Sequence, residues 1–298
     1  MSELKEHSCG PEGLPLYVRR YDYRKENFSQ IVDIERERLR RSKDSVKTVS
    51  NAIYKDGDSD ASEKPEDVSE YIIFSIDTAT HDRDFLDPNI ESKRGIRTTF
   101  DQNINSLAVK MVFHEHEQMS RALDIAISEA LTPMGLKKSI YFYGGTTLTV
   151  ANGSKEPDGA WGPKRPPMRS PRRPTVVAEV VITETHAKLV RDIGRWLDPI
   201  DGLAKVGLAI KADRRKPKIT IERWQYDTAK AEIENVQTIE IIESNEGDEV
   251  TLTGGPLLIP FHLFFLRPAE TPREGDIIID ENALKGIAQE IWEIQYTD

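Results

Sequence analysis

The sequence lacks the features of a secreted, disulfide-stabilised or membrane-spanning protein. Cys9 is the only cysteine, so an internal disulfide is excluded and nothing favours an oxidising compartment. Residues 1–10 are charged and lack the apolar core of a signal peptide. The longest apolar run, residues 257–266, is interrupted by Pro260 and His262 and is too short to span a membrane. We therefore expect an intracellular protein, cytoplasmic or nuclear, that makes no use of a membrane.

An excess of positive charge is also missing. The formal net charge is -10, with 41 Lys and Arg against 51 Asp and Glu. A nucleic-acid partner would therefore have to be bound by local basic segments rather than by a generally basic surface. Hydrophobic residues make up 38% of the 298 residues and charged residues 31%, a polar balance which indicates that part of the chain lies outside the core. The sequence gives no support for a homo-oligomer.

Several common catalytic motifs are absent as well. The chain has no phosphate-binding glycine loop and no Gly-x-Ser-x-Gly nucleophile elbow. Residues 114–117 read His-Glu-His-Glu, which is not the i, i+4 histidine spacing of zinc hydrolases, and no cysteine cluster exists to bind zinc. These motifs therefore give no basis for a nucleotide-binding loop, a serine hydrolase or a zinc hydrolase.

The amino-terminal third has the composition of an extension. Residues 1–70 are expected to form a tail, with a charged helix at 28–54 and an acidic disordered linker at 56–70. Residues 71–96, which begin with a short β-like run, would connect this tail to the folded domain. We expect that domain at 97–295.

The pattern of apolar residues in the domain predicts an α/β (α+β) fold. Strands are expected at 106–112, 139–143, 146–150, 175–182, 205–210, 219–224, 238–242 and 257–266, and helices at 116–131, 185–197 and from about 282 onward. Gly144-Gly145 between two of the strands is a hairpin signal. This order of elements predicts a mixed central sheet flanked by helices.

Two carboxylates stand out in the central part of this domain. Asp158 lies in a Glu-Pro-Asp-Gly turn, and Glu179 lies alone inside the apolar run 175–182. Burying an ionised carboxylate without a partner costs several kcal/mol, so Glu179 needs a metal ion or an ion pair. An Asp at the start of one strand and a Glu in the next can point at one spot, and two such oxygen ligands suit Mg²⁺.

A series of short segments, taken in order, resembles one known superfamily. The segments are Val109-Lys110-Met111, His116-Glu117, Met134-Gly135-Leu136, Gly145-Thr146, Lys155 to Asp158 with Trp161 and Pro163, Val177 to Val180 with Thr183-Glu184-Thr185, Leu189, Asp192 and Trp196, Ile219 to Trp224, and Phe261 to Arg267 with Gly275-Asp276. Together they resemble the PD-(D/E)xK nuclease superfamily, which has a restriction-endonuclease-like core. Within it the chain is most similar to fungal hypothetical proteins that carry such a domain.

The resemblance implies a nuclease that hydrolyses DNA or RNA with a water activated by Mg²⁺ or Mn²⁺. Asp158 and Glu179 would bind the metal, and Glu117 would be an accessory acidic residue. The superfamily's lysine, two residues after the Glu, is replaced here by Val181. Lys188, near the start of the next helix, is the candidate substitute; the alternative is that Lys188 is a solvated helix residue.

Two basic segments flank this candidate site in the sequence. The first, residues 155–173, is proline-rich and includes Trp161 as a candidate stacking face; its basic residues are Lys155, Lys164, Arg165, Arg169, Arg172 and Arg173. The second, residues 211–218, contains Lys211, Arg214, Arg215, Lys216 and Lys218. Both are candidate phosphate-contacting loops, although charged loops are commonly just solvated surface.

Two further functions stay open on the sequence alone. The missing lysine at Val181 is compatible with a degenerate nuclease fold that binds nucleic acid or a protein without cutting it. Glu179 in an ion pair would instead fit a structural or self-associating domain.

Overall fold

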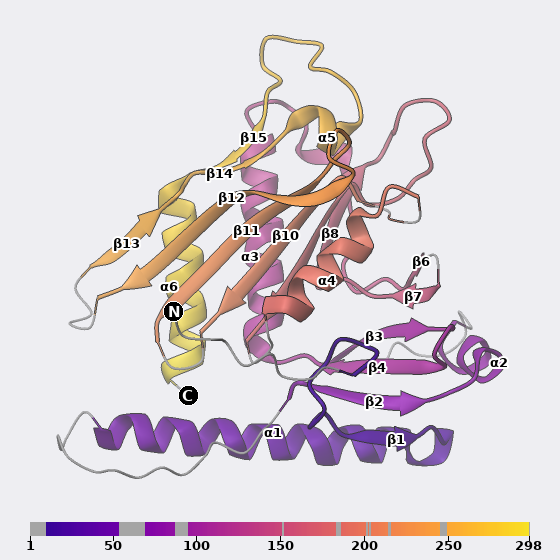
Figure 1. The fold of residues 1–298 in the computed structure, drawn as a ribbon. Helices are drawn as coiled ribbons and strands as arrows, with labels where there is room; N and C mark the ends of the chain where they lie inside the picture. The colour runs from indigo at the N-terminus through magenta and orange to yellow at the C-terminus, as the bar shows by residue number, and fades with distance from the viewer. Residues whose placement is uncertain are drawn as a thin grey trace. The chain divides into compact units, whose positions relative to one another are not determined.

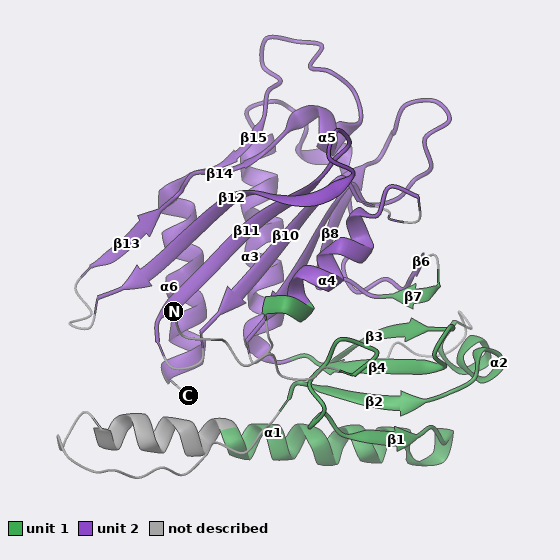
Figure 2. Cartoon of the chain, in the orientation of Figure 1, with its two compact units in different colours: residues 1–112, 152–155, 183–188 green, residues 113–151, 156–182, 189–298 purple. Residues whose placement is uncertain are grey.

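The computed structural model describes residues 10–53, 69–86, 95–150, 152–182, 186–200, 202, 204–213, 216–244 and 249–297. The chain divides into two compact units, which Figure 2 distinguishes by colour. The first comprises residues 1–112, 152–155 and 183–188, and the second comprises residues 113–151, 156–182 and 189–298. Of the helices in the described residues, none is both long enough and apolar enough to cross a membrane.

The first unit is a sheet accompanied by helices. Its strands are β1 (Arg20–Asp22), β2 (Tyr71–Ser75), β3 (Ile96–Asp101), β4 (Ser106–Met111) and β7 (Gly153–Lys155), hydrogen-bonded in the order β1-β2-β4-β3-β7. The long helix α1 (Lys25–Ile53) and the short α2 (Thr78–His81) belong to it, and one π-helical turn (Asp82–Leu86) continues α2. The predicted charged helix at 28–54 and the β-like run after residue 70 are therefore both confirmed.

The start of the chain differs from the loose tail expected there. Leu14 and Val18 are buried in one cluster with Tyr71, Ile73 and Ala108. Periodicity could not reveal this, because a loop that packs its side chains individually shows no repeat. Most of the predicted linker at 56–70 lies outside the described residues.

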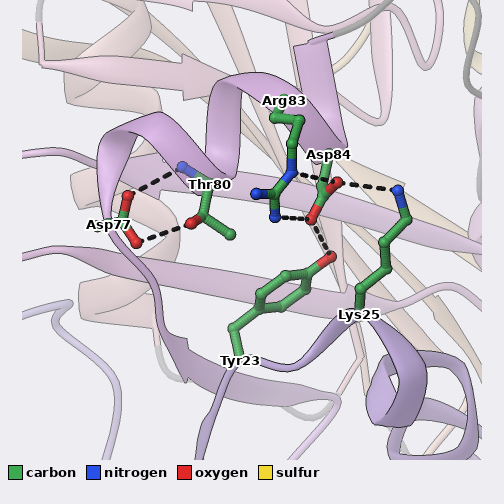
Figure 3. Close-up of polar contacts among 6 residues, drawn as sticks. All are labelled: Tyr23, Lys25, Asp77, Thr80, Arg83 and Asp84. Carbon is green, nitrogen blue, oxygen red and sulfur yellow. Dashed lines mark hydrogen bonds and ion pairs between the residues drawn. The ribbon is translucent and has the colours of Figure 1, made fainter.

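Asp84 joins the start of α1 to the turn after α2 (Figure 3). Its buried carboxylate accepts hydrogen bonds from Arg83 Nη2 at 2.8 Å, Lys25 Nζ at 3.0 Å and the Tyr23 hydroxyl at 3.2 Å. The hydrogen bond from Arg83, helped by Lys25, outweighs burial and holds the pKa of Asp84 well below its usual range. Asp77 caps α2 by accepting from the Thr80 backbone N–H at 2.9 Å.

Asp84→Asn is expected to lower the free energy of unfolding by about 1–2 kcal/mol at neutral pH, because charge-assisted hydrogen bonds to a buried group are lost while the two cations stay solvated. The folded-state pKa of Asp84 lies below its ordinary value of 3.8. Its contribution is therefore complete above about pH 4 and is lost as the pH falls further. Urea unfolding of both proteins between pH 7 and pH 3 should show the difference shrinking at the acidic end. The control Asp33→Asn removes an exposed pair with Arg36 and should change little; an equal loss there would contradict the prediction.

The second unit is built on a seven-stranded mixed sheet. The strand order is β13-β12-β11-β10-β9-β8-β5. The strands are β5 (Ile140–Phe142), β8 (Gly159–Pro163), β9 (Val176–Val181), β10 (Val206–Ala212), β11 (Lys218–Asp227), β12 (Glu232–Glu243) and β13 (Val250–Thr253). β9 and β10 are parallel and the other neighbours are antiparallel, so the predicted mixed sheet is confirmed.

Helices cover both faces of this sheet (Figure 1). α3 (His114–Leu131) and α6 (Glu281–Thr297) lie on one face, where their apolar stripes join Ala178 and Val180 in the main core. α4 (His186–Leu197) lies on the other face, where Leu189, Ile193 and Trp196 pack on Val177 and Val181. The fold is thus the expected α/β (α+β) arrangement of a mixed sheet flanked by helices.

The predicted hairpin is wrong, although both of its strands form. The strand at 139–143 does not form a hairpin with the one at 146–150: β5 pairs with β8, and β6 (Leu148–Val150) takes no part in the seven-stranded sheet. Ile140 is buried in the main core, and this packing decides the pairing of β5 in place of the hairpin turn expected at Gly144-Gly145.

The run 257–266 is not one strand. β14 (Leu257–Ile259) pairs with β15 (Ile277–Ile279), and a short helix α5 (Phe261–Phe265) follows. Pro260 precedes the helix, whose buried side chains Phe261, Phe264 and Phe265 are spaced i, i+3, i+4. A run that is apolar at nearly every position hides that spacing.

Candidate functional site

Strand register brings Asp158 and Glu179 together. β8 and β9 are antiparallel, with Gly159 opposite Ala178. Asp158 directly precedes β8, in a bend, and its Oδ2 accepts from the backbone N–H of Val180, the residue after Glu179 in β9. The two carboxylates that the sequence singled out are therefore neighbours.

Glu179 lies on the sheet face that α4 covers. Because side chains alternate along a strand, Glu179 shares its face with Val177 and Val181, which pack against α4. Asp158 and Glu179 are each only 3% exposed. The sequence thus predicted the burial of Glu179 correctly, and the structure adds that Asp158 is buried as well.

Each carboxylate is oriented by an N–H donor. Trp196 Nε1 donates to Glu179 Oε1 at 2.5 Å, and the backbone N–H of Val180 donates to Asp158 Oδ2 at 2.8 Å. Hydrogen bonds of this kind stabilise an ionised carboxylate and fix its direction. Sequence reasoning did not assign Trp196 a role, although its indole N–H is a polar donor on the otherwise apolar stripe of α4.

The donor set fits a hard divalent cation better than zinc. Among the described residues no group of three or more His, Cys, Asp or Glu side chains is placed to bind a metal ion. Zinc sites need three or four protein ligands, whereas Mg²⁺ is commonly bound by one or two carboxylates together with waters and phosphate oxygens. Asp158 and Glu179 have the donor chemistry of such a two-carboxylate site.

Lys188 is buried rather than solvated. It lies in the first turns of α4 and is 2% exposed, and its ammonium lies 5.1 Å from the centre of the Tyr71 ring. The alternative of a solvated lysine is therefore wrong. Lys188, Asp192 and Trp196 recur every four residues, which sets them on one face of α4. Val181, the position at which the resemblance implies a lysine, is buried among apolar side chains.

Glu117 stands apart from the pair. It is exposed in the first turn of α3, the helix on the opposite face of the sheet from α4. The described residues contain no three-ligand group that would include it. Its accessory role stays a prediction.

Residues 164–173 of the first basic segment lie in the loop between β8 and β9, whereas Lys155 is buried at the end of β7. Arg165, Arg169 and Arg172 are exposed there, and Lys164 Nζ lies 5.5 Å from the centre of the Tyr141 ring. Arg173 is partly buried and donates to the Gly202 carbonyl at 3.4 Å. Arg214 and Arg215, of the second basic segment, lie outside the described residues.

Trp161 does not offer a stacking face. Its side chain is fully buried in the main core, and its Nε1 donates to Asp124 Oδ1 at 2.7 Å. Ala160 packs in the cluster on the α4 face of the sheet. Because neighbouring strand residues point to opposite faces, the next residue, Trp161, points toward α3 instead of toward solvent.

No family model matches the chain, and no curated protein is similar to it. Among solved structures, the chain is similar to a protein from Anabaena variabilis described as a "putative nuclease belonging to DUF820". The two share 12% identity with a TM-score of 0.38, and the match covers 67% of this chain and 94% of that one. Similarity at this level assigns no activity to the chain, so Asp158 and Glu179 carry the functional inference.

Proposed function

We propose that the protein is a metal-dependent phosphodiesterase that hydrolyses nucleic acid. The observation that carries this proposal is the closeness of two buried carboxylates, Glu179 in β9 and Asp158 in the bend before β8, where Asp158 accepts from the N–H of Val180. Two neighbouring carboxylates are the oxygen donors that a hard divalent cation such as Mg²⁺ takes in proteins.

The proposed roles follow from the chemistry of each side chain. Asp158 and Glu179 bind Mg²⁺ or Mn²⁺, with Val180 N–H and Trp196 N–H holding the two carboxylates in place. A bound divalent cation would supply a water of lowered pKa and would neutralise charge on the scissile phosphate. Lys188 is proposed to take the role of the superfamily's lysine, whose position Val181 occupies here. Glu117 is proposed as an accessory acidic residue.

Substrate binding is assigned to the basic loop between β8 and β9. The exposed guanidinium groups of Arg165, Arg169 and Arg172 suit contacts to phosphate oxygens. On a chain with a net charge of -10 such contacts must be local, so binding is expected to weaken steeply with salt.

A second candidate function is a nucleic-acid-binding module without cleavage. The observation that favours it is Val181, whose apolar, buried side chain leaves the position of the superfamily's lysine without a charge. The two functions share the basic loop and differ only in the chemistry at Asp158 and Glu179.

The purified protein is expected to cleave plasmid, single-stranded DNA or RNA in the presence of Mg²⁺ or Mn²⁺. Cleavage is expected to stop when EDTA is added. Isothermal titration with Mn²⁺ supplies a second measurement that does not depend on activity. Metal binding with no cleavage of any substrate, combined with salt-sensitive binding of nucleic acid, would replace the nuclease with the binding module. Cleavage that persists in EDTA would contradict the metal-dependent mechanism.

A further inference from the structure

We propose that Tyr141 and Tyr143, with the basic residues around them, form a platform that binds single-stranded nucleic acid and leads it to Asp158 and Glu179. This inference rests on the proposed function, since it names the class of substrate for the same site. It concerns only the second unit of the chain.

The strand register aligns the two tyrosines with the carboxylates. Tyr141 lies opposite Gly162, and the Tyr143 N–H donates to the Ala160 carbonyl at 2.8 Å. Tyr143 packs against the same cluster as Ala160, on the α4 side of the sheet. Tyr141, two residues earlier, shares that face, as does Glu179 in β9.

The platform therefore extends along β8 away from the carboxylates. A strand rises about 3.3 Å per residue, so the row of Tyr143 is about 7 Å and that of Tyr141 about 13 Å from the row of Asp158. The two rings are 6.1 Å apart, centre to centre, and inclined at 70°. β5 is the last strand of the seven-stranded sheet, and Tyr141 is 41% exposed. A base can stack on that ring without displacing any neighbouring strand.

The charged residues next to the tyrosines in the sequence, and the one that contacts the Tyr141 ring, are positive. Lys137 and Lys138 are exposed directly before β5, and Lys164 lies over the Tyr141 ring. Neither residues 137–143 nor residues 164–173 contain an Asp or Glu. Aromatic faces between cations are how proteins bind single strands without sequence preference, because the rings stack on bases while the cations contact the phosphates. The charge thus favours a polyanion over an apolar or cationic partner.

The Tyr143 hydroxyl is a polar group whose hydrogen bond is not satisfied by the described part of the chain. The oxygen is buried and has no hydrogen-bond partner among the described residues. Burial, helped by Tyr141 and opposed by Arg172, raises the pKa of Tyr143, so the hydroxyl stays protonated at neutral pH. A protonated hydroxyl can donate to a phosphate oxygen or a base carbonyl. A ligand at the platform would satisfy this donor.

A single strand fits this surface better than a duplex. Bases inside a duplex stack on each other and hide their faces, whereas the bases of a single strand can unstack onto aromatic side chains. A duplex would be bound only through its phosphates, by the cations.

Fluorescence anisotropy in EDTA measures this binding without cleavage. Labelled single-stranded DNA, single-stranded RNA and duplex DNA are titrated with the wild type and with Tyr141→Ala, Tyr143→Phe and Phe142→Ala. Phe142 is the matched control, since it is 46% exposed on the same strand but lies opposite Trp161, on the other face. We expect Tyr141→Ala to weaken single-strand binding about tenfold or more, Tyr143→Phe a few-fold, and Phe142→Ala to leave it unchanged.

The platform would be overturned by equal effects of Tyr141→Ala and Phe142→Ala, or by tighter binding of duplex than of either single strand. Absence of any nucleic-acid binding, with a dimer that Tyr141→Ala dissociates, would assign the surface to a second copy instead. If the wild type cleaves nucleic acid but Tyr141→Ala binds it as tightly as the wild type, the platform is disproved and the nuclease proposal stands. If binding follows the expected pattern but no substrate is cleaved, the platform stands and the nuclease proposal is disproved.

Discussion

Glu179→Gln is expected to reduce metal-dependent cleavage by about 10³-fold or more. Glutamine keeps the size of the side chain and an oxygen that accepts from Trp196 Nε1, so the fold should be retained. The negative charge that binds the cation is lost, and a metal ion stabilises the transition state by several kcal/mol, where about 4 kcal/mol corresponds to 10³ in rate. Asp158→Asn should act in the same way, since asparagine still accepts from Val180 N–H.

The measurement is the initial rate of cleavage, accompanied by titration calorimetry with Mn²⁺. Glu129→Gln, an exposed carboxylate on α3, is the matched control and should keep the wild-type rate. Lys188→Met, of similar volume, should lower the rate while leaving metal affinity nearly unchanged, because lysine is not a metal ligand in this proposal. Wild-type rates in both carboxylate variants would disprove the assignment of Asp158 and Glu179.

Trp161→Ala is expected to lower the free energy of unfolding by about 3–5 kcal/mol. The indole is fully buried in the main core beneath α3, so its removal loses a large apolar contact and leaves a cavity. The Asp124 carboxylate also loses the N–H donor that stabilises it. Burial already raises the pKa of Asp124, so the carboxylate is held at a cost in this position.

Chemical denaturation of Trp161→Ala and Trp161→Phe separates packing from hydrogen bonding. Phenylalanine fills most of the volume and should lose only about 1–3 kcal/mol, the penalty for an unsatisfied buried group. Because Trp161 points away from the face of Asp158 and Glu179, cleavage per folded molecule should change little in the Phe variant. A loss below 1 kcal/mol in the Ala variant would contradict the burial of this side chain.

Local pattern was enough to predict that Glu179 is buried. Glu179 interrupts an apolar strand, and Asp158 directly precedes the strand that pairs with it. The helix after β9 was equally clear, because Leu189, Ile193 and Trp196 repeat at helical spacing. The hydrogen bond from Trp196 to Glu179 could not be predicted, because it depends on how α4 packs across the sheet and local sequence patterns do not specify that packing.

Features set by distant partners were beyond the reach of the sequence. β5 pairs with β8 across about twenty residues, and this pairing decides that Tyr141 is exposed on the side of the carboxylates while Trp161 is buried on the other. A shift of one residue in that register would exchange the two faces. The packing of Leu14 against Tyr71 is non-local in the same sense, so the first unit looked like a tail.

The position of β5 at the end of the sheet has a consequence for the behaviour of the protein in concentrated solution. An outermost strand presents unpaired backbone groups that can pair with the same strand of another molecule, and proteins commonly prevent this with nearby lysines. Lys137, Lys138 and Lys164 are in that position. The cations proposed to contact nucleic acid would therefore also keep two sheets apart. The same lysines would then contribute both to the solubility of the protein and to its affinity for nucleic acid.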